Sequence, residues 1–204
     1  MSQQPPLDFY FDFISPFGYF ASLRIDELAV KHGRSTTWHP MLLGVSVLKV
    51  MGLKPLLDTP LKGPYIERSV ERYRSLHGIT MKRQPRDEFM NPLPPARAYY
   101  WLFDQDAALA KRAARAIYRA YWRDGRDMGQ PDQLCAVLAP LGIDSDALRE
   151  ALADPRVAQR LRDEVEASMQ RGVFGSPFVI ADGEPFWGND SLDLLDLWLT
   201  KGGW

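Results

Sequence analysis

Apolar and polar side chains alternate near the start of the chain and then change to a helical period. Residues 8–13 (Asp-Phe-Tyr-Phe-Asp-Phe) carry phenylalanine at every second position, which predicts a buried β-strand. Ser15-Pro16 interrupts the alternation, and apolar residues then recur at helical spacing over 17–32. Residues 35–40 predict a second strand. Because a helix separates the two strands, we expect them to run parallel in a right-handed βαβ unit.

The middle of the chain has a helical pattern throughout. Apolar residues recur there every three or four positions, in stretches separated by prolines, glycines and acidic residues. The helices expected are 44–51, 65–77, 96–103, 107–123, 131–140, 145–153 and 156–171. A proline-rich crossing separates the first two of these helices, and a second proline cluster precedes the third.

The period changes again near the C-terminus. Residues 178–181 and 185–187 predict two short strands on either side of Asp182-Gly183, a pair that favours a type I′ hairpin turn. A last helix is expected from Ser191 onwards, with leucines along one side. The chain therefore ends in a ββα unit.

The order βαβ, helices, ββα is that of a thioredoxin-like fold with a large all-helical insertion, which places the protein in the α/β class. We expect residues 1–42 and 173–204 to form the thioredoxin-like domain and residues 43–172 to form the inserted helical domain. A chain of 204 residues with 46% hydrophobic residues can bury a substantial core.

Charge and cysteine content narrow the class of function. The 25 basic and 26 acidic residues leave a net charge of −1, so we expect no nucleic-acid partner. Cys135 is the one cysteine and lies in an apolar helical stretch, which excludes an intramolecular disulfide. No apolar run reaches the roughly 18 residues of a membrane span, and the N-terminal segment lacks a targeting pattern. We therefore expect a soluble cytoplasmic enzyme without a membrane partner.

The turn at Ser15 carries the first candidate chemistry. Thioredoxin-like redox proteins have a Cys-x-x-Cys motif there, with the thiolate stabilised by a helix N-terminus. Here the four residues are Ser15, Pro16, Phe17 and Gly18, which excludes dithiol chemistry. A site that favours a thiolate but has no thiol indicates that the thiol arrives with a cofactor. The alternative is that Ser15 is an ordinary N-cap, worth about 1 kcal/mol.

Two later segments are candidates for the same site. In the thioredoxin plan the proline of Ser176-Pro177 is cis and faces the Ser15 turn, so that the Ser176 backbone can pair with a bound peptide. An ordinary strand-entry proline is the alternative. Asn189 and Asp190 begin the last helix. Free amides there can hold a carboxylate while Asp190 faces an ammonium group, or both side chains can simply cap the helix.

Lysines surround the proline-rich crossing at 50–64. Lys62 is the candidate clamp for an anion, and Lys49 and Lys54 are candidates for binding a carboxylate substrate; each can also be an ordinary solvated lysine. The run 91–95 is interpreted as a rigid turn or as a roof over the pocket, with Asn91 as a substrate contact. The three histidines lack metal-ligand spacing, so no metal is expected.

Together these segments resemble the 2-hydroxychromene-2-carboxylate isomerases and their relatives, the kappa-class glutathione transferases. The resemblance extends over about residues 8–200, and its specific marks are 8–17, 172–177 and 187–190. It implies glutathione as cofactor, a small aromatic carboxylate as substrate and a homodimer. The chain departs from the pattern at Leu53, which follows a glycine where relatives often have asparagine.

The resemblance also implies roles for individual residues. Ser15 matches the active-site serine that supports the glutathione thiolate. Ser176 matches the residue whose backbone holds the cysteinyl part of glutathione. The other implied glutathione contacts are Phe17, Lys62, Trp187, Gly188, Asn189 and Asp190.

On this basis we expect a glutathione-dependent isomerase of aromatic-compound catabolism, as in naphthalene degradation. The thiolate adds to a ring carbon of 2-hydroxychromene-2-carboxylate, and ring opening, rotation and thiol loss give trans-o-hydroxybenzylidenepyruvate. One alternative is a kappa-like glutathione transferase or peroxidase, which releases the adduct instead. A second is a non-catalytic binding module that has kept the fold, in which Ser15, Ser176 and Asp190 act only as caps.

Overall fold

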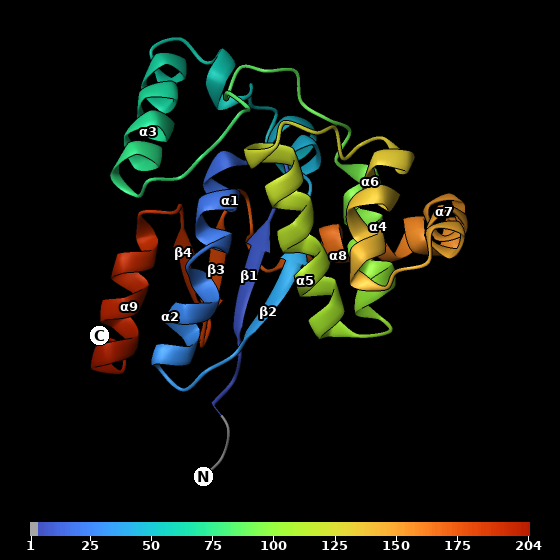
Figure 1. The fold of residues 1–204 in the computed structure, drawn as a ribbon. Helices are drawn as coiled ribbons and strands as arrows, with labels where there is room; N and C mark the ends of the chain where they lie inside the picture. The colour runs from blue at the N-terminus through green and yellow to red at the C-terminus, as the bar shows by residue number, and fades with distance from the viewer. Residues whose placement is uncertain (1–3) are drawn as a thin grey trace.

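The computed structural model describes residues 4–204, so residues 1–3 of the expected N-terminal domain lie outside the described part (Figure 1). Four strands and a series of helices follow one another in the expected βαβ, helical, ββα order. The elements are β1 (Leu7–Phe11), α1 (Pro16–Ser22), α2 (Ile25–Lys31), β2 (Thr36–Pro40), η1 (Gly44–Val50), η2 (Leu56–Asp58), α3 (Lys62–Leu76), α4 (Leu93–Phe103), α5 (Ala107–Tyr118), η3 (Arg119–Arg123), α6 (Pro131–Leu138), η4 (Ala139–Leu141), α7 (Ser145–Ala153), α8 (Pro155–Gln170), β3 (Phe178–Ala181), β4 (Glu184–Trp187) and α9 (Ser191–Lys201).

The strands form a mixed sheet in the order β2-β1-β3-β4. β1 and β2 run parallel with Leu7 opposite Thr36, whereas β3 is antiparallel to β1 and β4 is antiparallel to β3. The predicted parallel βαβ unit and the C-terminal hairpin are therefore confirmed. At the hairpin turn Asp182 and Gly183 have φ values of 52° and 89°, the positive values that a type I′ turn requires.

Alternate residues of β1 face two different apolar clusters. Phe9 and Phe11 belong to the main core, where both rings lie edge-on to the buried ring of Trp38. Tyr10 points to the other face of the sheet and packs in a smaller cluster with Val173. The sheet is thus buried on both faces, and Figure 1 shows α1 and α2 lying across one of them.

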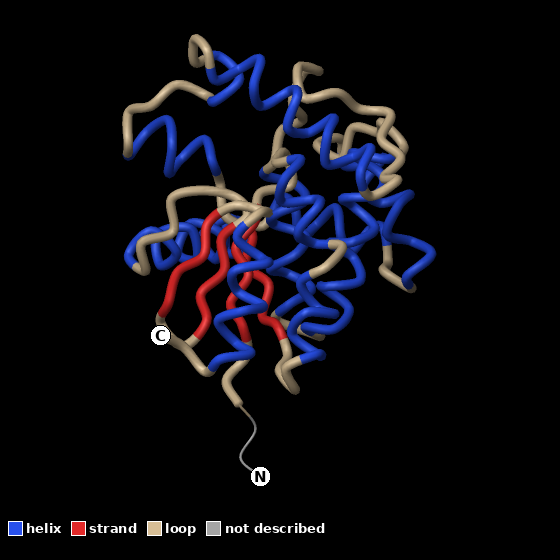
Figure 2. The backbone as a smooth tube through the Cα atoms, turned by 90° about the vertical axis from the view of Figure 1, so that its left-hand side faces the viewer, coloured by secondary structure: helices blue, strands red, loops and turns tan. Residues whose placement is uncertain are grey.

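A projecting arm, formed by η1, η2 and α3, lies above the end of the sheet at which β1 ends (Figures 1 and 2). Tyr73 of α3 anchors the arm because its ring stacks on Phe20 at 4.6 Å and its hydroxyl accepts a hydrogen bond from Arg24. Within the arm, a Cβ at position 63 would lie 2.2 Å from the Leu57 carbonyl oxygen. Glycine is therefore required where the start of α3 meets η2.

The single helix predicted over 17–32 is wrong, because the chain forms two shorter helices instead. α1 ends at Ser22, and Leu23 and Arg24 form i to i−3 hydrogen bonds to Phe20 and Ala21 that turn the chain. Contacts of the Arg24 guanidinium with α3 and α9 accompany this turn: it donates to Tyr73 and forms an ion pair with Asp193 at 2.7 Å.

Two helices begin earlier than predicted, at proline-containing segments. α3 starts at Lys62 with Pro64 in its first turn, and α4 starts at Leu93 with two prolines in its first turn. First-turn amides have no acceptor four residues earlier, so proline costs a helix little at these positions. The 91–95 run is therefore the beginning of a helix as well as a turn.

The remaining predicted helices are observed with small shifts at their ends, and 107–123 continues from α5 into the π-helical η3. Cys135 is buried, as predicted. Among residues 4–204, no helix combines the length and the apolar character that a membrane crossing requires.

Candidate functional site

Ser15 joins β1 to α1 and has two hydrogen-bonding partners. Its Oγ accepts from the Gly18 amide at 3.0 Å, so the predicted N-cap is present. The same hydroxyl donates to the backbone oxygen of Ser176 at 2.9 Å, across a sequence separation of 161 residues. A hydroxyl that both caps a helix and contacts the strand-entry segment lies where the two halves of the thioredoxin-like fold meet.

The peptide bond between Ser176 and Pro177 is cis, as the thioredoxin plan predicts. Ser176 Oγ accepts from the Asp12 amide at 2.8 Å, which fastens this segment to the end of β1. Within residues 4–204 the amide of Ser176 donates to no protein acceptor, and the residue is half-buried. The backbone here is therefore open to pairing with an extended ligand.

Two aromatic side chains of the helical insert form hydrogen bonds to the backbone just before Ser15. Tyr118 donates its hydroxyl to the Asp12 carbonyl at 3.0 Å, and Trp122 donates its indole N–H to the Phe13 carbonyl at 3.0 Å. A Cβ at position 18 would lie 2.7 Å from the Tyr118 hydroxyl and 2.8 Å from Ser176 Oγ. Gly18 is thus required for α1 to approach. Sequence reasoning missed Tyr118 and Trp122, because no local motif marks a contact made across more than 100 residues.

Asp12 is a buried carboxylate next to this cluster. One of its oxygens accepts from the Leu43 amide at 2.8 Å and the other from the Ile14 amide at 3.2 Å, so it links the Ser15 turn to the base of the arm. Burial raises the pKa of Asp12 to about 6, although backbone amides partly offset this rise. These two hydrogen bonds therefore fix the end of the strand.

The loop before α9 contacts the cis-proline segment. Gly188 donates its amide to the Pro177 carbonyl at 3.0 Å, and a Cβ at position 175 would lie 2.3 Å from the indole nitrogen of Trp187. This packing places Trp187 and Gly188 beside Ser176.

The start of α9 lacks the side-chain cap that one interpretation of the sequence predicted. Asp190 already has helical dihedral angles, and its side chain accepts no amide hydrogen bond among the described residues. Asn189 is 4% exposed, and its side-chain oxygen is buried without any hydrogen-bond partner in residues 4–204. A buried acceptor of this kind calls for a donor from outside the protein.

The other candidate residues lie outside this cluster. Lys49, Lys54 and Lys62 are exposed on the arm and form no ion pair or hydrogen bond within residues 4–204. Asn91 is exposed, and its side-chain oxygen accepts from the Leu93 amide at 3.1 Å, which helps to start α4. Phe17 lies in the first turn of α1, partly buried against the core.

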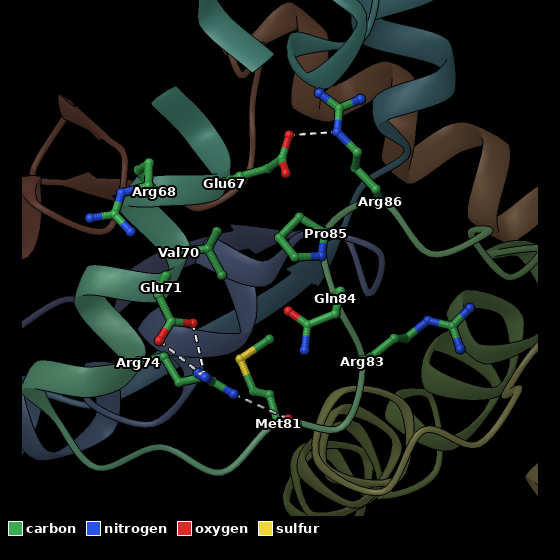
Figure 3. A pocket seen from close by; sticks show the side chains of 10 residues that line it. All are labelled: Glu67, Arg68, Val70, Glu71, Arg74, Met81, Arg83, Gln84, Pro85 and Arg86. Atoms are coloured by element: carbon green, nitrogen blue, oxygen red, sulfur yellow. Dashed lines mark hydrogen bonds and ion pairs between the residues drawn. The ribbon is translucent and has the colours of Figure 1, made fainter. Parts of the chain in front are cut away.

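A cavity of about 310 Å³ lies on the arm, between α3 and residues 81–86, and Figure 3 shows the side chains that line it. Its two carboxylates are paired within it: Glu67 with Arg86, and Glu71 with Arg74 at 2.9 Å. None of the candidate lysines lines this cavity. The cavity and the Ser15 cluster are therefore two separate features.

Comparison with known proteins identifies the family of this chain. The family model of the DSBA-like thioredoxin domain matches residues 6–199. The chain belongs to this family. The thioredoxin-like fold predicted from the order of elements is thereby confirmed.

Two relatives of this DSBA-like protein have functional names. A 2-hydroxychromene-2-carboxylate isomerase from Sphingobium xenophagum is 29% identical over 194 residues, which cover 95% of this chain and 97% of the relative. Glutathione S-transferase kappa 1 from Caenorhabditis elegans is 24% identical, with coverage of 96% and 91%. A solved structure of 2-hydroxychromene-2-carboxylate isomerase superposes with a TM-score of 0.82 at 26% identity, covering 96% of this chain and 94% of that one. The resemblance predicted from the motifs is confirmed.

Proposed function

We propose that the protein is a glutathione-dependent isomerase that converts 2-hydroxychromene-2-carboxylate, or a related aromatic-catabolism intermediate, to the trans-o-hydroxybenzylidenepyruvate product. Ser15 carries this proposal: a hydroxyl replaces the redox thiol and contacts the carbonyl that precedes the cis-proline. The 29% identity to a named isomerase over 95% of the chain supports the substrate class.

Glutathione fits the polar groups that the protein leaves open. The unpaired amide and the carbonyl of Ser176 suit antiparallel pairing with the cysteinyl residue of the tripeptide. The buried, unpartnered oxygen of Asn189 and the exposed carboxylate of Asp190 suit the ammonium of a γ-glutamyl group. The amides of Asn189 and Asp190, which donate to no acceptor within residues 4–204, suit its carboxylate. Trp187 and Gly188 complete this loop.

When bound, glutathione supplies the thiolate nucleophile that adds to the substrate and leaves again. The contribution of Ser15 is a hydrogen bond donated by Oγ, which lowers the pKa of a nearby thiol. In the structure that proton is donated to the Ser176 carbonyl. If this carbonyl accepted from a ligand N–H instead, the Ser15 hydroxyl would be free to donate its hydrogen bond to the sulfur, while the Gly18 amide would keep Oγ in place.

The arm is proposed to supply positive charge to the substrate side. Lys49 and Lys54 have unpaired ammonium groups and suit the carboxylate of the substrate, with Asn91 as a further polar contact. Lys62, at the first position of α3, suits the second carboxylate of glutathione, and Phe17 adds an apolar contact from α1.

The test is turnover of 2-hydroxychromene-2-carboxylate by Ser15→Ala at saturating glutathione. We expect kcat to fall about 100-fold, the usual effect of removing one donor to a developing or bound anion. We also expect the pKa of the bound thiol, followed by thiolate absorbance in the ultraviolet, to rise. If Ser15→Ala turned over the substrate as fast as the wild type, the proposed role of Ser15 would be wrong.

Ser168→Ala is the matched control, because this serine is also buried and donates to the backbone of its own helix, at 2.7 Å. It should lower stability slightly without changing kcat or the thiol pKa. Conjugation of 1-chloro-2,4-dinitrobenzene in place of isomerisation would identify a transferase instead. Calorimetry that finds no glutathione binding would favour a binding module.

A further inference from the structure

A second cavity, of about 490 Å³, lies between α1 and α2 on one side and α5 with η3 on the other. We name it the α1–α5 groove; its lining includes Tyr19, Asp26, Arg112, Arg115 and Arg119 but neither Ser15 nor Ser176. Small-molecule sites commonly have volumes of about 300–1,000 Å³. The groove is therefore large enough for a ligand of its own.

Three arginines share one wall of this groove. Arg112, Arg115 and Arg119 are spaced three and four residues apart, so their side chains project from one face of α5 and η3. Like charges at this spacing repel one another and destabilise a helix. Such a row calls for nearby negative charge.

Two carboxylates, Asp26 and Glu27, line the groove with these three arginines, so the protein provides counter-charge for only part of the row. Asp26 is already occupied: it pairs with Arg115, lies 3.4 Å from the Lys111 ammonium and accepts from Thr36. Within residues 4–204, Arg112 and Arg119 form no ion pair and no hydrogen bond. Two guanidinium groups on the groove wall are thus available to an anion.

Tyr19 adds a neutral donor at the same place. The residue is only 3% exposed, and its hydroxyl forms no hydrogen bond among residues 4–204 but keeps some contact with solvent. Burial raises the pKa of Tyr19, the positive charges of Arg123 and Arg119 oppose this rise and the negative charge of Asp124 adds to it, so the phenol stays protonated at neutral pH. Tyr19 lines the groove together with the arginines, so its hydroxyl offers a neutral donor there that has no protein acceptor within residues 4–204.

We infer that the α1–α5 groove binds a phosphate group, held by the guanidinium groups of Arg112 and Arg119 and by the hydroxyl of Tyr19. Phosphate suits this set because a guanidinium fork matches its oxygens in a bidentate manner. Its charge also balances two cations where a single carboxylate would balance one. Leu23 and Leu141 line the groove as well and provide apolar contacts for the organic part of a phosphorylated molecule. This inference is independent of the proposed isomerase activity.

The test is calorimetric titration of the full chain with inorganic phosphate and with phenyl phosphate, at ionic strength held constant with chloride. We expect saturable binding of one equivalent, with phenyl phosphate the tighter ligand because of the apolar contacts. Arg119→Met should weaken both affinities about tenfold or more, since charge-assisted hydrogen bonds are the strong ones. Tyr19→Phe, which keeps the ring, should weaken them several-fold.

Arg72→Met is the matched control, because Arg72 is another exposed arginine without an ion pair within residues 4–204 and lies outside the groove. It should leave phosphate binding unchanged. Heat changes equal to those of chloride alone, or equal weakening by Arg72→Met and Arg119→Met, would overturn the inference. If inorganic phosphate bound more tightly than phenyl phosphate, the free ion would be the ligand. The proposed contact of Leu23 and Leu141 with an organic group would then be wrong. Tyr19→Phe keeps the test decisive if an arginine variant fails to fold.

Discussion

Asp8 and Asp12 lie on the same strand segment, four residues apart, yet their surroundings differ completely. Asp8 accepts from His39 at 3.0 Å and from Arg171 at 2.7 Å, and it remains partly exposed. Asp12 is 1% exposed, and its carboxylate accepts from the backbone amides of Leu43 and Ile14. Among the ion pairs of residues 4–204 none involves Asp12.

The two pKa values move in opposite directions for this reason. Burial by itself would raise the pKa of Asp8, but hydrogen bonds and charges from His39 and Arg171 lower it. Burial raises the pKa of Asp12 to about 6, and amide hydrogen bonds offset only part of the effect. Asp8, at the end of β1 away from Ser15, is therefore paired with charged side chains, as partly buried carboxylates usually are. Asp12, beside Ser15, is not paired with any cation within residues 4–204. Buried groups with shifted pKa values of this kind concentrate at functional sites.

The largest expected effect is on the pH dependence of the free energy of unfolding, to which Asp12 and Asp8 should contribute with opposite signs. Unfolded Asp12 releases its proton near the ordinary value of 3.8, while the folded protein keeps it up to about pH 6. The folded state binds more protons in this window, so the free energy of unfolding falls by about 2 kcal/mol as pH rises from 4 to 7. Asp12→Asn should remove this fall in urea titrations at each pH. Parallel curves for wild type and variant would break the comparison.

Asp8 should show the opposite sign in the same titrations. Its pKa is lowered in the folded protein, so the stability it contributes is present above its unfolded pKa and is lost as pH falls through the folded value. Asp8→Asn should therefore reduce the fall in stability below about pH 4, whereas the Asp12 effect lies between about pH 4 and 7. The two variants serve as controls for each other.

The next effect is on turnover. Asp12→Ala leaves the Leu43 and Ile14 amides without acceptors, so the Ser15 turn and the base of the arm are no longer fixed to each other. We expect kcat at saturating glutathione to fall about tenfold, since small misplacements of a catalytic group have effects of this size. Asp8→Ala should change kcat less than about twofold. Equal effects would show that the two ends of the strand do not differ in function.

The smallest effect concerns the paired end of the strand. Arg171→Met removes the guanidinium that contacts Asp8 and Tyr10, but this arginine side chain is 45% exposed. We therefore expect a loss below about 1 kcal/mol at neutral pH and a smaller loss at high salt. Arg162→Met, on an exposed part of α8, is the reference for the loss of a surface arginine. A loss of several kcal/mol would show that the Asp8 pair behaves as a buried one.

Some differences between prediction and structure come from the beginnings of helices. A proline cluster in the sequence indicates a turn, but Pro64 and the two prolines of 94–95 occupy first turns, where the missing amide had no intrahelical acceptor. The break after Ser22 had no signal of its own in the sequence. It accompanies contacts of Arg24 with Tyr73 and Asp193, which come from two other helices.

The sequence by itself determined the type and order of most elements and the placement of a hydroxyl at the turn where redox relatives have thiols. These features depend on spacing, on proline and glycine, and on side-chain size, all of which are local. The tertiary structure alone decided which groups converge on Ser15, because Ser176 is 161 residues away. It also decided that Asn189 has an unpartnered buried oxygen and that Asp12 has amides rather than a cation as partners. Burial and hydrogen-bond partners are properties of the packed chain, so no single segment encodes them.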